Sequence, residues 1–138
     1  MRAKPYIVDL PKTIKFHAQM WKACTCAYCE NFRLAFKEHP INKSGTLNEF
    51  GFDLQGEMEI MDLFWNGTRD KRVYEVFYAV QGTLIEDGYS FEDGEALVHL
   101  YQSNSPKLCY DLTDMKPPCF FLVLRIELPW LLEEIPED

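Results

Sequence analysis

The sequence predicts an α+β domain, in which an antiparallel β-sheet of about six strands, curled or packed as a sandwich, carries one main helix after the first strand. Apolar residues alternate along most of the second half of the chain, and one segment near the N-terminus has helical periodicity. Aromatic residues, which suit the pleated surface of strands, make up 14% of the 138 residues. The length fits a single domain, residues 1–138, with a loose acidic tail at 133–138.

The first predicted element is a strand over residues 14–21. Ile14 and Phe16 point to one side of this strand, whereas Lys15 and His17 point to the other. Such alternation is typical of a strand with one buried and one solvent-exposed face. We therefore expect His17 on the exposed face, close to the cysteines that follow.

The main helix is predicted over residues 27–38. Phe32 and Phe36 are one helical turn apart and would face the core. Pro40 ends the helix, because proline cannot continue it. A short helical turn is expected over residues 46–50.

The second half of the chain is predicted to be sheet. Asn66 and Gly67 mark a turn, and Gly82 indicates a bulge or bend in a long strand. The last strand has apolar residues on both faces, so we expect it in the middle of the sheet. The predicted strands cover residues 57–65, 72–85, 95–101, 108–112 and 119–128.

The formal net charge of −8 argues against two classes of partner. Nucleic-acid binding draws its affinity from Lys and Arg at phosphates, and anionic membrane surfaces also attract basic segments. We expect no signal peptide and no membrane-spanning segment, because no apolar run is long enough. The cysteine count of five is odd and therefore favours reduced thiols, which indicates the cytoplasm.

Cys24, Cys26 and Cys29 form the segment richest in reactive groups, between the predicted strand and the main helix. One interpretation is a zinc site, because closely spaced thiolates suit tetrahedral zinc, and His17 is the preferred fourth ligand. The second pair of ligands that a complete zinc motif has is missing. The alternative fourth ligands are Cys109, Cys119 and His39.

A second interpretation is thiol redox chemistry. Cys26-Ala-Tyr-Cys29 resembles the glutaredoxin active-site motif, and this resemblance implies a thiol–disulfide oxidoreductase that uses both cysteines. Pro118, before the last strand, is similar in place to the cis-proline of thioredoxin-like folds. Those folds alternate strands and helices, however, whereas this chain has a continuous sheet pattern. A third interpretation is that the cysteines pack as small apolar side chains or form a simple disulfide, and the three remain open.

Two stretches together are similar to an uncharacterised bacterial family, found mostly in Firmicutes. The resemblance implies a bacterial, cytoplasmic origin and brings no activity, cofactor or catalytic residue. The stretches are Cys26-x-x-Cys29-x-Asn31-Phe32 with residues 47–53, and Leu128-Pro129-Trp130-Leu131-Leu132-Glu133.

Other polar residues have weaker claims to a functional role. Glu57 and Glu59 share a strand face with each other and lie near Asp62, so they could bind a hard cation. Charges on an edge strand that discourage aggregation explain them better. His99 alternates with core positions and is expected to be a solvent-face or structural residue rather than a catalytic one.

The aromatic residues of the predicted sheet have two interpretations. Tyr74, Tyr78 and Tyr101 could line a binding face, but alternating aromatics on a sheet are usually core residues or cross-strand pairs. Because no catalytic constellation is complete, the sequence predicts a small cytoplasmic binding or interaction domain for a protein or small molecule. Zinc is the one cofactor the residues suggest, and self-association would use the aromatic sheet faces. The alternative is the oxidoreductase.

Overall fold

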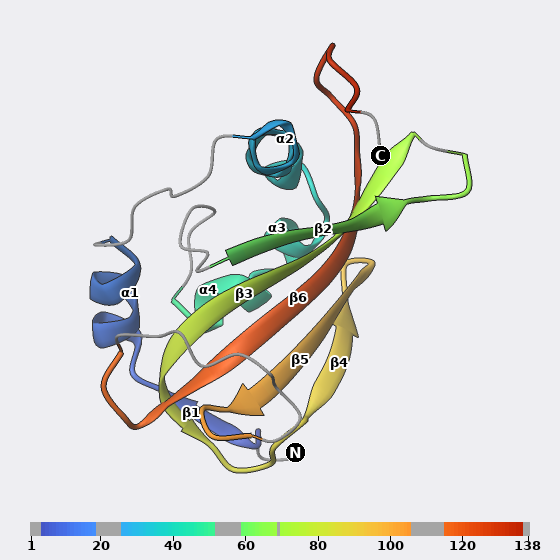
Figure 1. Cartoon of the computed structure of the whole chain (residues 1–138). Helices are drawn as coiled ribbons and strands as arrows, with labels where there is room; N and C mark the ends of the chain where they lie inside the picture. Colours follow the sequence, from blue (N-terminus) through green and yellow to red (C-terminus); the bar gives the residue numbers. More distant parts are fainter. Residues whose placement is uncertain (1–3, 19–25, 52–58, 69, 106–114, 137–138) are drawn as a thin grey trace.

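The computed structural model describes residues 4–18, 26–51, 59–68, 70–105 and 115–136 (Figure 1). The chain is an α+β domain with a curled antiparallel sheet of six described strands and a few short helices, so the predicted fold class is confirmed. The elements are β1 (Tyr6–Val8), α1 (Leu10–Ala18), α2 (Ala27–Phe36), α3 (Ile41–Ser44), α4 (Thr46–Glu49), β2 (Glu59–Trp65), β3 (Lys71–Leu84), β4 (Ser90–Asp93), β5 (Ala96–Gln102) and β6 (Cys119–Pro129).

Two long strands, β3 and β6, form the centre of the sheet and run diagonally across Figure 1. They pair antiparallel from Lys71 opposite Pro129 to Gln81 opposite Cys119. Strand β5 pairs with the other edge of β6, and β4 pairs with β5. On the far edge of β3, β2 pairs with the first half of the strand and β1 with its last residues. Strand β6 therefore has neighbours on both sides, as predicted from its apolar faces.

The inner face of the sheet carries the hydrophobic core. Alternate residues of β3, including the fully buried Tyr74 and Tyr78, point to this face. Helix α2 covers it with Phe32 and Phe36, whose rings stack 4.8 Å apart. The short helices α3 and α4 add Ile41, Leu47 and, directly after α4, Phe50 to the same core cluster. The helical prediction for residues 27–38 is confirmed over α2.

The predicted strand at residues 14–21 is wrong over residues 14–18, because these residues belong to helix α1. Asp9 precedes the helix and accepts a hydrogen bond from the Lys12 backbone N–H, and Pro11 lies in the first turn, where its missing N–H is tolerated. The buried positions are Thr13 and His17, four residues apart, whereas Ile14 is exposed. Residues 19–21 lie outside the described part of the chain.

Helix α1 covers a gap at the edge of β3. Among the described residues, β2 pairs with β3 as far as Phe77, and the pairing of β3 with β1 starts only at Gly82, opposite Val8. Between them, the Gln81 backbone N–H donates to the Thr13 hydroxyl at 3.0 Å, and His17 Nε2 donates to the Ala79 carbonyl at 2.7 Å. The helix is thus attached to the sheet through polar side chains, which is why the apolar pattern did not reveal it.

The remaining strand predictions are confirmed where the structure describes the chain. Strands β2, β3, β5 and β6 lie within the predicted ranges or within one or two residues of them. The predicted strand at 108–112 and the first two residues of 57–65 lie outside the described residues. The sequence reading missed β1, β4 and α3, which have only three or four residues each. Gly82 is where β1 approaches β3: a Cβ there would lie 2.0 Å from the Ile7 carbonyl oxygen.

Candidate functional site

The predicted metal ligands lie on two different helices, as far as the structure describes them. Cys26 is exposed at the N-cap position of α2, Cys29 is buried one turn later, and Cys24 lies outside the described residues. His17 lies on α1, 6% exposed, with its ring 6.2 Å from the ring of Tyr78. Because its Nε2 donates to a carbonyl, a neutral His17 would offer only Nδ1 to a metal.

No group of three or more His, Cys, Asp or Glu is arranged to hold a metal ion among the described residues. The four-ligand set with Cys24 therefore stays a prediction. Of the alternative fourth ligands, Cys109 lies outside the described residues, and Cys119 is half-buried with a thiol pKa that burial raises. His39 is 7% exposed and lies against Phe36.

The fold also separates the chain from thioredoxin-like enzymes. Pro118 does follow a cis peptide bond. The sheet around it is antiparallel, however, with β3 and β5 on either side of β6, rather than an alternation of strands and helices. The thiol chemistry of Cys26 and Cys29 must therefore be judged on the geometry of α2 alone.

The two stretches that resemble the bacterial family meet in space. Asn31 is fully buried on α2. Its side-chain amide forms hydrogen bonds with the backbone at the end of β6 and just after it. Its Nδ2 donates to the Pro129 carbonyl at 3.1 Å, and its Oδ1 accepts from the Leu131 N–H at 2.7 Å. The ring of Tyr28 lies 5.8 Å from that of Trp130. These contacts span about 100 residues of sequence and hold the C-terminal segment on α2.

A buried arginine completes this contact, which we call the arginine cluster (Tyr28, Asn31, Asp62, Trp65, Arg72 and Trp130). Arg72 is 3% exposed, and its Nη2 donates to Asp62 at 2.7 Å. The guanidinium carbon lies 4.6 Å from the ring centre of Tyr28 and 5.1 Å from that of Trp65. Charge and aromatic faces are matched inside the protein, so this cluster is structural.

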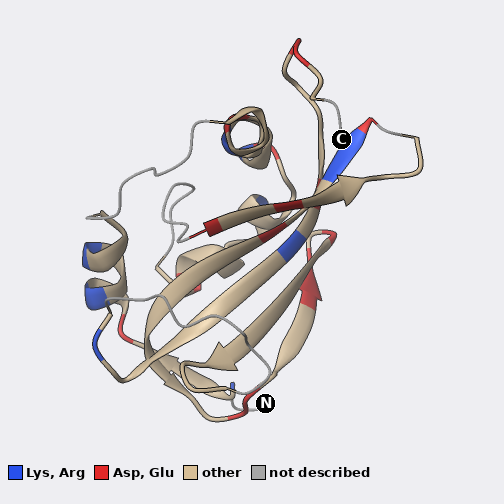
Figure 2. Ribbon diagram, viewed as in Figure 1, with Lys and Arg blue, Asp and Glu red and all other residues tan. Residues whose placement is uncertain are grey.

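On the outer face of the sheet, one row of residues crosses five strands and carries a charge on three of them. The register places Met61, Glu75, Arg125, Leu97 and Glu92 next to one another, from β2 to β4. The adjoining row contains Phe64, Val73 and Glu127. Figure 2 shows the basic position on β6 and acidic positions on β4 in this region. Further along, Phe77 and Phe121 are buried, so the charged rows lie at one end of the face.

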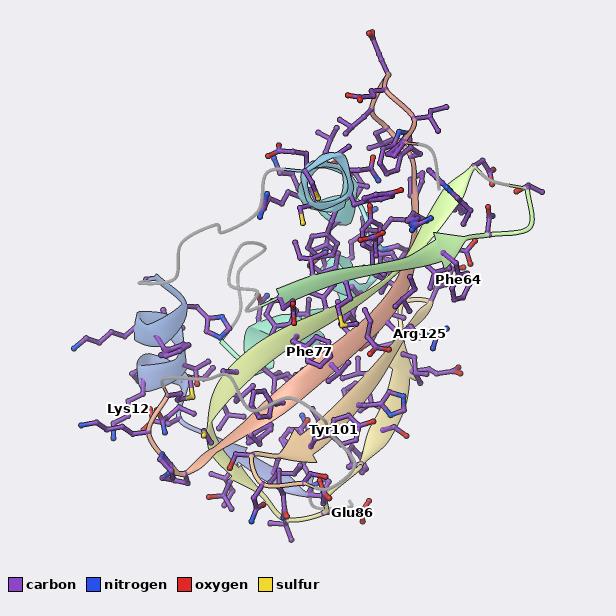
Figure 3. The ribbon with its side chains drawn as sticks, viewed as in Figure 1. Lys12, Phe64, Phe77, Glu86, Tyr101 and Arg125 are labelled. Atoms are coloured by element: carbon purple, nitrogen blue, oxygen red, sulfur yellow. The ribbon has the colours of Figure 1, made fainter. Side chains whose placement is uncertain are left out.

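At this end the face is hollowed by a groove of about 630 Å³, which we call the outer groove. Phe64, 49% exposed, stands on one side, and the guanidinium carbon of Arg125 lies 5.8 Å from its ring centre (Figure 3). Four carboxylates and this one guanidinium are the charged groups among the described lining residues. The lining residues are Phe64, Val73, Glu92, Asp93, Gly94, Glu95, Ala96, Leu97, Arg125, Ile126 and Glu127.

One wall of the outer groove is the tight turn between β4 and β5. Gly94 and Glu95 both have positive φ, 54° and 67°, as a two-residue hairpin turn requires. A Cβ at position 94 would lie 2.5 Å from the Ile41 nitrogen, so the turn packs directly on α3. The Asp93 carboxylate accepts a hydrogen bond from the Thr46 hydroxyl. These contacts hold the acidic wall in place before any ligand arrives.

A second hollow of about 450 Å³ continues from the first, and we call it the side groove. Glu95 and Glu127 line both hollows. The Asn66 side-chain amide donates to Glu127 at 3.2 Å. Burial lowers the pKa of His39, which lines the side groove, while the carboxylate of Glu95 acts in the opposite direction.

The other side chains singled out from the sequence lie elsewhere. Asp62 belongs to the arginine cluster, Glu59 is exposed on β2, and Glu57 lies outside the described residues. His99 is half-buried and stacks on Tyr101, with ring centres 6.0 Å apart. The sequence reading missed the groove carboxylates. The alternation of Arg125 and Glu127 with buried residues at the end of β6 was the available signal.

The two buried tyrosines belong to the structure rather than to a binding face. Tyr74 donates its hydroxyl to the Tyr28 carbonyl at 2.8 Å, and burial raises its pKa far above the ordinary range. Tyr78 is fully buried in the core. Tyr101 is half-buried on the outer face, away from the groove.

Among known proteins, no family model, curated protein sequence or solved structure matches this chain. None of the described helices is long and apolar enough to cross a membrane. Fold and site together define the chain as an α+β domain with a preformed, charged groove on the outer face of its sheet.

Proposed function

We propose that this protein is a small binding domain whose ligand occupies the outer groove. The observation that carries the proposal is the groove itself, whose volume of about 630 Å³ falls within the range of roughly 300–1,000 Å³ typical of ligand pockets. It combines an exposed aromatic ring with an apolar floor and a few charged groups, as binding sites usually do.

The lining supports binding rather than covalent chemistry. Among the described residues that line it, the polar side chains are four carboxylates and one guanidinium, with no Ser, Thr, Cys or His. Carboxylates and guanidinium orient a ligand through charge-assisted hydrogen bonds. Phe64 offers an aromatic face that costs little conformational entropy to use, because the strand already holds it.

Nuclear magnetic resonance with a library of small fragments tests the proposal. We expect binders to shift the backbone amide signals of Phe64, residues 92–97 and residues 125–127. Phe64→Ala should weaken such binders about tenfold, because a well-packed aromatic contact contributes about 1–2 kcal/mol. Ile85→Ala removes another exposed apolar side chain, 65% exposed and outside the groove lining, and should change nothing. Fragments that bind only elsewhere would refute the proposal.

A second candidate is thiol–disulfide exchange by Cys26 and Cys29. The exposed Cys26 at the helix start and the buried Cys29 one turn later are arranged as an attacking and a resolving thiol would be. Iodoacetamide should then alkylate Cys26 faster at neutral pH than it alkylates a model thiol. An equal or slower rate would remove this candidate.

We further propose that the binding domain holds a structural zinc ion and works in the cytoplasm. The support for zinc is the spacing of Cys24, Cys26 and Cys29 with His17 as fourth ligand, and for the cytoplasm the odd number of cysteines. Protein purified without chelator should contain near-stoichiometric zinc, and chelation should lower its melting temperature. Membership of the bacterial family is supported by the two stretches that resemble it, which the hydrogen bonds of Asn31 to Pro129 and Leu131 join in space.

A further inference from the structure

We infer that the outer groove binds a basic, extended segment of a partner polypeptide, with Arg or Lys side chains set against the carboxylates of Glu92, Glu95 and Glu127. This inference rests on the proposed function and names its class of ligand. Its first support is the negative charge of the groove, whose lining has four carboxylates and one guanidinium.

A single guanidinium cannot cancel the negative charge of four carboxylates. Arg125 lies directly opposite Glu75 of β3 in the sheet register and has the ring of Phe64 beside it. Opposite charges on facing strands attract each other at this separation. The carboxylates on the β4–β5 side therefore define the potential that an incoming ligand meets.

The floor of the groove suits the stems of long basic side chains. The half-buried Leu97 and the edge of Val73, 9% exposed, contribute apolar surface between the charged groups. Lys and Arg lay their methylene stems on apolar surface while their charged heads reach polar groups. At one end of the groove, the guanidinium carbon of Arg125 lies 5.8 Å from the ring centre of Phe64, so this part of the lining already accommodates a cation.

The shape favours an extended chain over a compact molecule. The side groove shares Glu95 and Glu127 with the outer groove, and its lining also includes one further carboxylate, Glu38, and one ammonium group, Lys71. Successive residues of an extended chain advance about 3.3 Å, so side chains two positions apart could enter neighbouring hollows. Because contacts with α3 and α4 hold the turn at residues 93–95, little ordering is needed when the chain binds.

Charge excludes the main competing occupants. A nucleic acid or an anionic lipid surface would be repelled by the carboxylates and by the net charge of −8. A second copy of this chain carries the same net charge, which opposes its docking in the groove. A basic partner is attracted from a distance by that same charge, which raises its rate of association.

The test uses the full chain and two blocked heptapeptides of alternating leucine and a second residue. The second residue is arginine in one peptide and citrulline, its uncharged counterpart, in the other. We expect the arginine peptide to shift the amide signals of residues 92–97 and 125–127. The citrulline peptide should bind at least about tenfold more weakly, since the charge-assisted hydrogen bonds are lost. Equal affinity of the two peptides would overturn the inference.

Two triple variants with the same change in net charge provide the control. Glu92→Gln/Glu95→Gln/Glu127→Gln should weaken the arginine peptide at least about tenfold. Glu86→Gln/Glu133→Gln/Glu134→Gln removes three exposed carboxylates outside the groove, and Glu86 lies at the opposite end of the sheet (Figure 3). This variant should retain affinity within about twofold. Equal losses in both variants would mean unspecific attraction and overturn the inference.

Spermine and the fragment library separate the remaining outcomes. Spermine that binds the groove as tightly as the arginine peptide would indicate a polyamine site and overturn the polypeptide ligand. Fragments in the groove without arginine-peptide binding would overturn the ligand class and leave the proposed function standing. If neither fragments nor peptides shift the groove signals, both fail. Circular dichroism melts confirm that each variant is folded.

Discussion

The arginine cluster and the outer groove place the same pair of groups, a guanidinium and an aromatic ring, in opposite surroundings. Arg72 is 3% exposed between Tyr28 and Trp65, with Asp62 as its ion-pair partner. Arg125 is exposed, and its one described ring contact is the half-exposed Phe64. The same chemistry therefore stabilises the fold in one place and leaves surface for a ligand in the other, because only burial makes it costly to break.

The largest loss of stability is expected when the buried arginine, Arg72, is replaced. Arg72→Met should lower the free energy of unfolding by about 2–4 kcal/mol, since Asp62 loses its partner and two rings lose a packed cation. Arg125→Met, the matched substitution on the same sheet, should lower it by less than about 0.5 kcal/mol. Urea denaturation followed by circular dichroism measures both. Similar losses for the two variants would show that burial does not separate the two arginines.

A somewhat smaller effect is expected at Asn31. Asn31→Ala removes the hydrogen bonds to Pro129 and Leu131 and should cost about 1.5–3 kcal/mol, because the remaining backbone groups lose a buried partner. Asn48→Ala changes an exposed asparagine on α4 and should stay within about 0.5 kcal/mol of the wild type. Thermal melts provide the measurement. An unchanged melting temperature for Asn31→Ala would mean that the C-terminal segment is held by other contacts.

The smallest effect concerns pH and the side groove. Burial lowers the pKa of His39 below its ordinary value of 6.5, so the unfolded chain binds a proton more readily than the folded protein. The contribution to stability is complete above pH 6.5 and is lost as the pH falls from there towards the folded-state pKa. The neutral ring accepts a hydrogen bond from the Ile41 N–H at Nδ1, 3.2 Å away, and protonation removes this acceptor.

His39→Asn isolates this contribution, because its amide oxygen can replace the Nδ1 acceptor without titrating. Urea midpoints between about pH 7.5 and pH 5.5 should fall more steeply for the wild type than for His39→Asn, a window in which histidine is the side chain expected to titrate. If the urea midpoints of the two proteins changed with pH in parallel, protonation of His39 would not contribute to the pH dependence of stability.

The sheet was predictable because its side chains follow a local rule. Alternation along β3 and β6 depends on the period of a strand, which each stretch of sequence displays by itself. Helix α1 escaped prediction because its buried positions, Thr13 and His17, are polar and bond the edge of β3. These two side chains are buried because α1 fills the gap between β1 and β2 along β3, and a local sequence pattern cannot reveal such a gap.

The candidate site was far less predictable. Glu59 and Asp62 attracted attention because they lie close together in sequence, yet one is exposed and the other is bound to Arg72. The groove carboxylates come from the β4–β5 turn and from β6, about 30 residues apart, and meet through strand pairing. Sequence distance hides such a cluster until the register is known.

By itself, the sequence determined the α+β class, the main helix, the long strands and the acidic character of the chain. Those features follow from periodicity and composition, which act locally or over the whole chain. Only the tertiary structure decided that Arg72 is enclosed while Arg125 is open. Whether a guanidinium is enclosed depends on elements distant in sequence, here α2, β2 and the C-terminal segment at Arg72, and the β4–β5 turn beside Arg125.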